Sequence, residues 1–414
     1  NASTAVIDGL VAAGTLVQVE LPEKRLPVPN PAHTKVTFND QQAQAVHMLQ
    51  AAIDGGVFSV SLLDGVTGSG KTEVYFEAIA RALERHPDAQ VLVMLPEIAL
   101  TGQFIERFER RFGVKPVEWH SAVSPVDRGR IWKAASTGEA RIVIGARSAL
   151  FLPFRDLGLI IVDEEHDPGF KQEDRVFYQG RDMAVVRGRL GNIPVVLASA
   201  TPSIESHWNT RSGRYRHVHL AHRFSGSELP NVEPIDLRKA PPEKGKWLSP
   251  VLVEAVTQAI GRGEQALLFL NRRGYAPMTL CRGCGHRLDC PQCTAWLVEH
   301  RFRHRLSCHH CGFSLPIPEG CPKCGGVGTL VPCGPGVERI AEEVTARWPD
   351  ARQAILSSDL IPGITELREV LRTIIDGEAQ IIVGTQIVAK GHNFSKLQLV
   401  GVVDGDLGLA GSDP

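Results

Sequence analysis

Two short runs in the sequence have the residue types and spacing that chemistry on phosphate requires. The first fits G-x-x-x-x-G-K-[ST], in which glycines let backbone N–H groups point at phosphate oxygens. Lys71 would bring a positive charge to the β- and γ-phosphates, and the Thr72 hydroxyl would be a ligand for Mg²⁺. The predicted nucleotide-binding residues of this run are Gly65, Val66, Thr67, Gly68, Ser69, Gly70, Lys71 and Thr72. We therefore expect a nucleoside triphosphate to bind here.

The second run is Asp163-Glu-Glu-His166, which directly follows the apolar stretch Gly158–Val162. A carboxylate at the carboxyl end of a parallel strand lies beside the phosphate loop in a doubly wound sheet. We expect Asp163 to hold Mg²⁺ and Glu164 to polarise the attacking water, and we include Lys71 and His166 in the catalytic set. A solvated acidic turn is the alternative, which the phosphate loop upstream disfavours.

Eight of the nine cysteines form four Cys-x-x-Cys pairs. Each pair can occupy two corners of a tetrahedron, so four pairs predict two closed zinc sites of structural type. The predicted ligands are Cys281, Cys284, Cys290, Cys293, Cys308, Cys311, Cys321 and Cys324. The pairs can be combined in three ways and the spacing does not choose, although we prefer a nested arrangement with the two central pairs inside. Redox-active or iron–sulfur cysteines are the competing interpretations, and the lone Cys333 is expected to be a packed thiol.

Aromatic and basic residues interleave just beyond the acidic run. Bases stack on aromatic faces while Arg and Lys contact phosphates, so this composition is typical of a strand-binding loop. The predicted DNA-coupling residues are Phe170, Lys171, Arg175, Phe177, Tyr178 and Arg181. Their position suggests that strand binding could be transmitted to Glu164, and a patch of core-packed aromatic residues is the alternative.

The elements that must position these groups alternate between short apolar strands and longer helices. Strands are predicted at Phe58–Leu63, Val91–Leu95, Arg141–Ile144, Leu159–Val162 and Val195–Leu197, and in a second set at Gln265–Leu270, Gln353–Leu356, Gln380–Val383 and Leu399–Val403. This alternation predicts an α/β fold with parallel sheets covered on both faces. The cysteine cluster interrupts the second set after its first strand.

Composition sets further limits. The 414 residues carry 45 Lys and Arg against 46 Asp and Glu, which excludes a uniformly basic coat but allows a local groove for a polyanion. No apolar run approaches the roughly 20 residues that span a bilayer, so we expect no membrane association. The chain starts at Asn1 without a Met or a signal-like segment and stops at Pro414, and we expect an internal piece of a longer cytoplasmic protein.

The order of the motifs resembles that of superfamily 2 helicases of the DEAH type. Phe38-Asn-Asp-Gln-Gln42 resembles their adenine-reading Gln motif, with Gln42 as the expected reader, and Ser199-Ala-Thr201 resembles motif III, which links hydrolysis to strand movement. The remaining matches are Leu95–Thr101 to motif Ia, Phe269–Gly274 to motif IV and Val383–His392 to motif V. The resemblance implies two RecA-like helicase lobes.

With the cysteine cluster after motif IV, the chain closely resembles the bacterial primosomal replication-restart helicases, the PriA family. The resemblance implies an ATP-dependent 3′→5′ DNA helicase of the bacterial cytoplasm that recognises stalled or repaired forks and initiates primosome assembly. It also implies the nested zinc pairing, ATP with Mg²⁺ and two Zn²⁺ as cofactors, and forked and single-stranded DNA, single-strand-binding protein and other primosome proteins as partners. An RNA helicase of superfamily 2 and a zinc-dependent nucleic-acid-binding scaffold with weak ATPase activity are the competing functions.

We expect the following division of the chain. Residues 1–21 would be the tail of a winged-helix-like module, 22–36 a linker, 37–229 the ATP-binding lobe 1, 230–278 the start of lobe 2, 279–328 the zinc-binding insertion and 329–414 the continuation of lobe 2. The Gln-x-x-Gly-Arg-x-Gly-Arg sequence of motif VI, whose arginine meets the γ-phosphate in this superfamily, is not found in the chain. We therefore expect the 414 residues to bind nucleotide but to hydrolyse it poorly.

Overall fold

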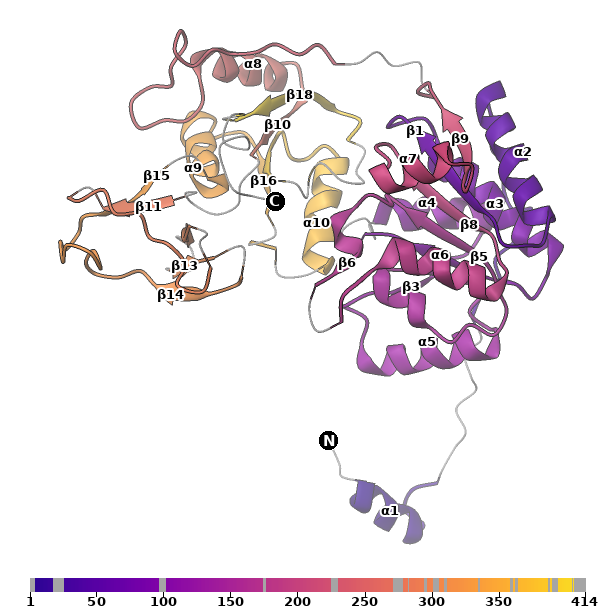
Figure 1. The fold of residues 1–414 in the computed structure, drawn as a ribbon. Coiled ribbons are helices and arrows are strands. Elements are labelled where there is room, and N and C mark those ends of the chain that lie inside the picture. Colours follow the sequence, from indigo (N-terminus) through magenta and orange to yellow (C-terminus); the bar gives the residue numbers. More distant parts are fainter. Residues whose placement is uncertain are drawn as a thin grey trace.

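The structure is a computed structural model. It describes residues 4–17, 26–96, 102–173, 176–224, 230–270, 278–281, 283–293, 296–300, 305–308, 311–333, 336–357, 360–361, 364–385, 388, 394–403 and 405. Within these residues, two parallel sheets lie side by side, and a cysteine-rich insertion projects from the smaller one (Figure 1).

The larger sheet has seven parallel strands in the order β3-β4-β2-β5-β8-β1-β9. Its strands are β1 (Val60–Gly65), β2 (Gln90–Met94), β3 (Val117–Trp119), β4 (Ile142–Gly145), β5 (Leu157–Asp163), β8 (Val195–Ser199) and β9 (Arg216–Leu220). Its helices are α2 (Asp40–Asp54), α3 (Lys71–Arg85), α4 (Gly102–Phe112), α5 (Pro125–Thr137), α6 (Gly180–Gly191) and α7 (Ile204–Arg211), with the 3₁₀ turns η2 (Arg147–Phe151) and η3 (Pro168–Phe170). A short antiparallel pair, β6 (Lys171–Gln172) and β7 (Tyr178–Gln179), precedes α6.

Alternation along the central strands explains why the sheet is covered on both faces. Val91 and Val93 of β2 pack with helices α2, α3 and α4, whereas Leu92 and Met94 pack on the opposite face with η2, α5 and α6. Successive side chains of a strand point to opposite faces, so a continuous apolar run needs an apolar layer on each side. The runs that predicted a doubly covered parallel sheet therefore have that structure.

The smaller sheet is also parallel, with the order β16-β17-β10-β18. Its strands are β10 (Gln265–Phe269), β16 (Gln353–Leu356), β17 (Ile381–Gly384) and β18 (Leu397–Val402), and its helices are α8 (Pro250–Gly261), α9 (Val337–Arg347) and α10 (Ile364–Ile375). Helix α8 starts where Ser249 accepts a hydrogen bond from Leu252 N, with proline at the first helical position. The sheet packs through two apolar clusters, one on each side.

The cysteine-rich insertion lies between β10 and α9. The antiparallel pair of β11 (Met278–Cys281) and β15 (Leu330–Cys333) brackets the predicted insertion of residues 279–328. A three-stranded antiparallel sheet of β12 (Val298–His300), β13 (Arg305–Ser307) and β14 (Ser314–Pro316) lies inside it. The buried apolar side chains here are few, chiefly Leu288, Leu297 and Leu306, so this segment has only a small core of its own.

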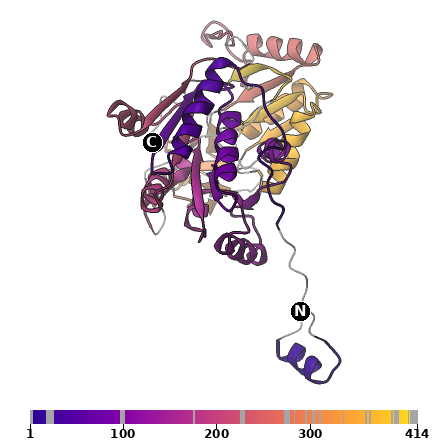
Figure 2. The same ribbon diagram turned by 90° about the vertical axis from the view of Figure 1, so that its right-hand side faces the viewer.

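The structure departs from the predictions at the first residues and at sheet edges. Helix α1 (Thr4–Ala12) stands apart from the sheets (Figures 1 and 2). The run Thr15-Leu-Val-Gln-Val19 has the composition of a strand, but Thr15–Val17 do not form one, and the rest of the run lies outside the described residues. The strands β3 and β9 at the two edges of the larger sheet were not predicted. No helix in the described parts of the chain is long and apolar enough to cross a membrane.

In each sheet, a buried glutamine at the start of a central strand forms hydrogen bonds with backbone groups of the neighbouring segments. Gln90, the first residue of β2, donates to the carbonyls of Ala135 and Ala140 and accepts from Asp156 N at 2.9 Å. Gln265, the first residue of β10, donates to the carbonyls of Ile374 and Ala379. Both side chains are almost completely buried, so they satisfy the backbone groups at the end of a helix that water does not reach.

We expect the Gln90→Ala substitution to lower the free energy of unfolding by about 2–3 kcal/mol, because buried backbone groups lose their hydrogen-bond partners. Gln353→Ala is the matched control, since Gln353 is also the first residue of a strand but is exposed. It should cost less than about 0.5 kcal/mol. Urea denaturation followed by circular dichroism measures both, and equal losses in the two variants would contradict the role given to Gln90.

Candidate functional site

The predicted phosphate loop, acidic run and motif III meet at one edge of the larger sheet. Strands β5, β8 and β1 are adjacent, and their ladders pair Asp163 with Ala198 and Asp64 with Ser199. The carboxyl ends of these three strands therefore lie together, as expected for a ligand site in a parallel sheet. The structure brings Asp163, Ser199 and the loop after Gly65 into one place.

The glycines of the phosphate loop are required either by lack of space or by a positive φ angle. A Cβ at Gly65 would meet Ser69 Oγ at 2.6 Å and Leu220 Cβ at 2.8 Å, and Gly68 and Gly70 have positive φ angles of 80° and 85°. Helix α3 starts directly after this loop at Lys71, so the partial positive charge of its N-terminus faces the loop. Val66, Thr67 and Gly68 are exposed and open to a ligand. The loop fits a bound phosphate chain.

Lys71 and Asp163 are opposite charges in a largely dehydrated place. Lys71 Nζ donates to Gly65 O at 2.7 Å, and burial lowers the pKa of Lys71 although the carboxylates of Glu164 and Asp163 oppose this shift. Burial also raises the pKa of Asp163, opposed by the hydrogen bond that Tyr75 donates to Asp163 Oδ2 at 2.8 Å and by the Lys71 charge. A partly dehydrated carboxylate beside a phosphate loop fits a divalent cation, and Thr72 on the first turn of α3 offers the hydroxyl ligand.

The residues after Asp163 turn sharply away from the strand. Glu164 has a φ of +49°, a left-handed conformation that costs a residue other than glycine about 1–3 kcal/mol and persists where the surroundings impose it. Glu164 N donates to Asp163 Oδ1 at 2.9 Å. The side chain of Glu164 lies 3.6 Å from His166 Nδ1. The turn therefore ends the strand at Asp163 and brings the Glu164 side chain beside His166.

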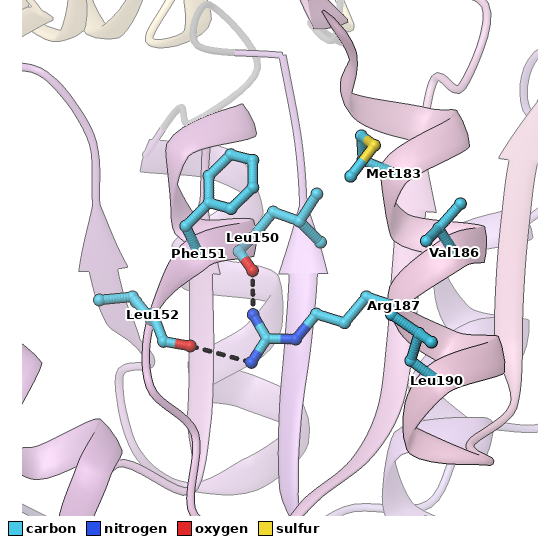
Figure 3. Close-up of a pocket in the computed structure, with 7 residues that line it drawn as sticks. All are labelled: Leu150, Phe151, Leu152, Met183, Val186, Arg187 and Leu190. Carbon is cyan, nitrogen blue, oxygen red and sulfur yellow. Dashed lines mark hydrogen bonds between the residues drawn. The ribbon is translucent and has the colours of Figure 1, made fainter.

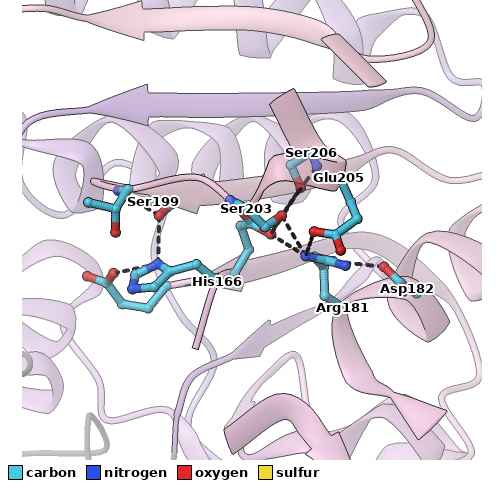
Figure 4. Close-up of polar contacts among 10 residues, drawn as sticks. His166, Arg181, Asp182, Ser199, Ser203, Glu205 and Ser206 are labelled. Carbon is cyan, nitrogen blue, oxygen red and sulfur yellow. Dashed lines mark hydrogen bonds and ion pairs between the residues drawn. The ribbon is translucent and has the colours of Figure 1, made fainter. Parts of the chain in front are cut away.

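His166 joins the acidic run to motif III. Its Nδ1 lies 2.7 Å from Ser199 Oγ, which in turn accepts a hydrogen bond from Thr201 N at 3.0 Å (Figure 4). The first and last residues of the Ser-Ala-Thr motif are therefore connected to the histidine of the acidic run.

Glu165 is a site residue that sequence reasoning missed. Its carboxylate is completely buried and accepts hydrogen bonds from Ser203 N, Ser203 Oγ and Ser206 Oγ at 2.7, 3.0 and 3.0 Å. Arg181 Nη1 donates to the same carboxylate at 3.1 Å. A buried carboxylate needs such partners, so Glu165 fixes the start of α7 and of α6 relative to β5. In the sequence, only its place as the second glutamate of the acidic run indicated that Glu165 could belong to the site.

Two residues predicted to contact a strand are buried instead. Arg181 is 6% exposed because its guanidinium is held by Glu165, Asp182 and Ser203, so it is not available to a phosphate. Phe170 is 1% exposed and packs in the core beneath the sheet, as the core-packed alternative proposed. The start of α6 and the η3 turn direct these side chains inward, so neither is placed to contact a strand directly, and their role in DNA coupling stays a prediction.

The other described residues of this loop reach the surface. Phe177 is 77% exposed, and Lys171 is also exposed and pairs with Glu173. Tyr178 packs edge-to-face on Phe151 with the ring centroids 5.3 Å apart. Phe151 also lines an apolar hollow between η2 and α6, where Arg187 donates to the carbonyls of Leu150 and Leu152 (Figure 3). Arg175 lies outside the described residues.

Gln42 touches the phosphate loop directly. Its side chain is buried and donates to Ser69 O at 2.8 Å while accepting from Asn39 N at 3.2 Å. The second contact is half of a capping box that starts α2. Gln42 therefore links the start of α2 to the phosphate loop, and its role as the adenine reader stays a prediction.

The cysteines gather into two groups, and their combination is the nested one. The inner group is Cys290, Cys293, Cys308 and Cys311, and the outer group is Cys281, Cys284, Cys321 and Cys324. Between pairs, the Sγ–Sγ distances are 3.3 and 3.4 Å in the inner group and 3.7 Å twice in the outer group. These separations are far longer than the roughly 2.05 Å of a disulfide and suit four thiolates around one ion.

The backbone of the pairs repeats a tight turn. The N–H groups of Gly285, Gly312 and Gly325 donate to the carbonyls of Cys281, Cys308 and Cys321, and all three glycines have positive φ angles between 70° and 76°. The glycine after each of these pairs is thus required by the turn. A hydrogen bond between Cys281 and Thr329 lowers the pKa of the Cys281 thiol to about 6, which favours the thiolate that a metal needs.

Two parts of the chain match family models of helicases. Residues 39–207 match the DEAD/DEAH box helicase family, and residues 290–316 match the PriA DNA helicase Cys-rich region (CRR) domain. The chain is also similar over most of its length to the following bacterial relatives.

Similar proteins named "Replication restart protein PriA" occur in several bacteria. The chain is 44% identical over 376 residues to that of Rickettsia felis, which covers 91% of this chain and 57% of the relative. It is 40% identical over 420 residues to that of Haemophilus influenzae, covering 99% and 56%. It is 37% identical over 413 residues to that of Bacillus subtilis, covering 99% and 51%. The chain thus spans little more than half the length of these relatives.

Two solved structures are similar in fold. RecG bound to a three-way DNA junction superposes with a TM-score of 0.51 at 17% identity, covering 89% of this chain and 38% of RecG. The DUF1998 helicase MrfA bound to DNA superposes with a TM-score of 0.52 at 15% identity, covering 92% of this chain and 44% of MrfA. At these identities the likeness concerns the fold alone, and it agrees with two RecA-like lobes.

We expect substitutions in each cysteine group to remove one zinc ion and leave the other. Cys290→Ser with Cys293→Ser should reduce bound zinc by about one per chain, and Cys281→Ser with Cys284→Ser should do the same, because each group is complete by itself. Cys333→Ser, which changes the cysteine that belongs to no Cys-x-x-Cys pair of the sequence, is the control and should leave the zinc content unchanged. Metal analysis by mass spectrometry measures this, and loss of all zinc from either variant would contradict two independent groups.

Proposed function

We propose that this chain is the ATP-driven core of a 3′→5′ DNA helicase that acts at stalled or repaired replication forks and initiates primosome assembly. The observation that carries this proposal is the meeting of the phosphate loop, the Asp163–Glu164 pair and Ser199 at one edge of a parallel sheet. Similarity to relatives named "Replication restart protein PriA" and the match to the PriA Cys-rich region support the choice of DNA and of replication restart.

The residues of the site suit hydrolysis of a triphosphate. The loop amides and Lys71 would hold the phosphates, and Glu164 would orient and polarise the attacking water. Thr72 and Asp163 would hold Mg²⁺, which neutralises phosphate charge when bound. Tyr75 and Glu164 N each hold one oxygen of Asp163, so the carboxylate is oriented before the ligand arrives. His166 would act as a positioning residue through Ser199.

A route for coupling DNA binding to hydrolysis follows from the neighbours of Glu164. The exposed Phe177 immediately precedes β7 and α6, and Arg181 in the first turn of α6 is bonded to Glu165. A strand that stacks on Phe177 would shift the start of α6, and Glu165 would pass that shift to the adjacent Glu164. Arg181 therefore serves as a positioning residue rather than as a phosphate contact.

The cofactors we propose are ATP with Mg²⁺ and two structural Zn²⁺. Each cysteine group offers four ligands within 4.8 Å of one another, which leaves no open coordination position. Structural zinc can contribute on the order of 10 kcal/mol to folding, which suits a segment with a small apolar core. The zinc ions therefore hold the insertion together and take no part in hydrolysis.

The competing functions differ in what they require of the site. A scaffold with vestigial ATPase activity has no need for Lys71, Thr72, Asp163 and Glu164, all of which are present. An RNA helicase would keep them, and the family resemblance favours DNA. Single-strand-binding protein and other primosome proteins as partners, and the bacterial cytoplasm as location, are proposals from the same resemblance.

The test of this function is to measure ATP hydrolysis by a protein of the relatives' full length in the presence of different nucleic acids. We expect forked DNA to stimulate ATP hydrolysis more than single-stranded DNA, and RNA to have little effect. Glu164→Gln should lower the stimulated rate by about 10²–10⁴-fold while nucleotide binding persists, because only the water-polarising group is lost. The 414-residue chain, which has no motif VI sequence, should bind nucleotide but turn it over slowly. Equal stimulation by RNA, or full turnover by Glu164→Gln, would overturn the proposal.

The coupling loop has its own test. Phe177→Ala should raise the DNA concentration for half-maximal stimulation of the full-length ATPase by about 5- to 150-fold, since stacking of one base is worth about 1–3 kcal/mol. Basal hydrolysis without DNA should be unchanged. Trp132→Ala, which removes another exposed aromatic side chain on α5, is the control. The same DNA dependence in Phe177→Ala, Trp132→Ala and the parent would count against the loop.

A further inference from the structure

Three side chains that the helicase reaction does not use meet beside the phosphate loop. Asp64 Oδ2 lies 3.1 Å from His217 Nε2 and 3.3 Å from His219 Nδ1. The three ligand atoms all lie within 4.8 Å of one another. Asp64 is the penultimate residue of β1, and both histidines are on β9, the edge strand beside it.

The pairing of β1 with β9 produces this arrangement. His217 and His219 are two residues apart on one strand, so their side chains project from the same face of the sheet. Asp64 is the ladder partner of His219 on the neighbouring strand. Two imidazoles and a carboxylate on one face of a strand pair form a rigid set, because their backbone positions are fixed by the sheet.

The donor atoms are those that transition metals prefer. Imidazole nitrogens with one carboxylate oxygen suit Zn²⁺, Ni²⁺, Co²⁺ or Cu²⁺, whereas Mg²⁺ prefers oxygen ligands alone. Three protein ligands leave at least one coordination position open, unlike the four thiolates of each cysteine group. The side chains of His217 and His219 are 44% and 51% exposed, so an ion can reach them from solvent.

We propose that Asp64, His217 and His219 form an open site for one divalent transition-metal ion, distinct from both cysteine groups. This inference does not rest on the proposed function. An ion there would bind edge strand β9 to β1, and β9 supports the phosphate loop. Val66 N donates to Leu220 O at 3.3 Å, and Phe224 N, just after β9, donates to Gly68 O at 2.9 Å. The ion would thus stiffen the outer wall of the nucleotide site.

The test is calorimetric titration of the protein with Zn²⁺ after its cysteine groups are loaded. We expect one further equivalent to bind, and the His217→Ala/His219→Ala variant to lose it or bind it at least tenfold more weakly. The matched control, His86→Ala/His222→Ala, removes two other exposed histidines and should bind as the parent does. Equal uptake by the parent, the site variant and the control would overturn the site.

Two further measurements keep the inference testable if the double variant folds poorly. Asp64→Asn preserves the shape of the side chain and should also lose the further equivalent. Co²⁺ at this site should give weak visible absorption without the intense near-ultraviolet thiolate band that the cysteine groups produce. Amide hydrogen exchange at residues 216–220 should slow when the ion binds. Uptake of Co²⁺ only with the thiolate band, or unchanged exchange with the ion bound, would contradict the site.

Discussion

The structure depends on holding a carboxylate and an ammonium in a place that water scarcely reaches. Asp163 ends a buried strand, Lys71 starts the helix after the phosphate loop, and burial works against the charged form of both. Their attraction and the hydrogen bond from Tyr75, which is itself completely buried on α3, oppose that cost. Tyr75 can reach Asp163 only if α3 packs across the sheet at the right depth. The geometry of the ATP site is therefore a property of the whole doubly covered sheet.

The acidic run also organises the elements around it. Its residues contact different neighbours. Asp163 faces the phosphate loop, and His166 contacts Ser199. Glu165 accepts hydrogen bonds from residues at the starts of α6 and α7. The left-handed turn at Glu164 lets the chain leave the strand and present these side chains in different directions. Polar networks of this kind can carry coupling between separate parts of a protein. The buried Arg181–Glu165 ion pair joins the start of α6 to the acidic run.

The second sheet and its insertion are stabilised by different interactions. The four-stranded sheet is stabilised by apolar clusters on both faces, whereas the insertion relies on two cysteine groups because it buries few apolar side chains. The two sheets also meet through a polar contact, in which Arg368 of α10 donates to Glu118 of β3 at 2.6 Å. That ion pair joins residues 250 positions apart and is half-exposed, so its energetic contribution is small and its contact is easily broken.

Local spacing was enough to predict much of this protein. The phosphate loop, the acidic run, the cysteine pairs and most strands of the two sheets are set by residues close together in the chain, where glycine, charge and apolar periodicity have a direct conformational meaning. Contacts between distant residues were decided only in three dimensions. The sequence left open which cysteine pairs share a metal, and predicted Arg181 and Phe170 at a surface where they are buried. The acidic run contains Glu165 but does not reveal the partners of its carboxylate, and no local pattern connects Asp64 with His217 and His219. Those outcomes depend on strand order and helix packing, which bring together side chains that no local pattern connects.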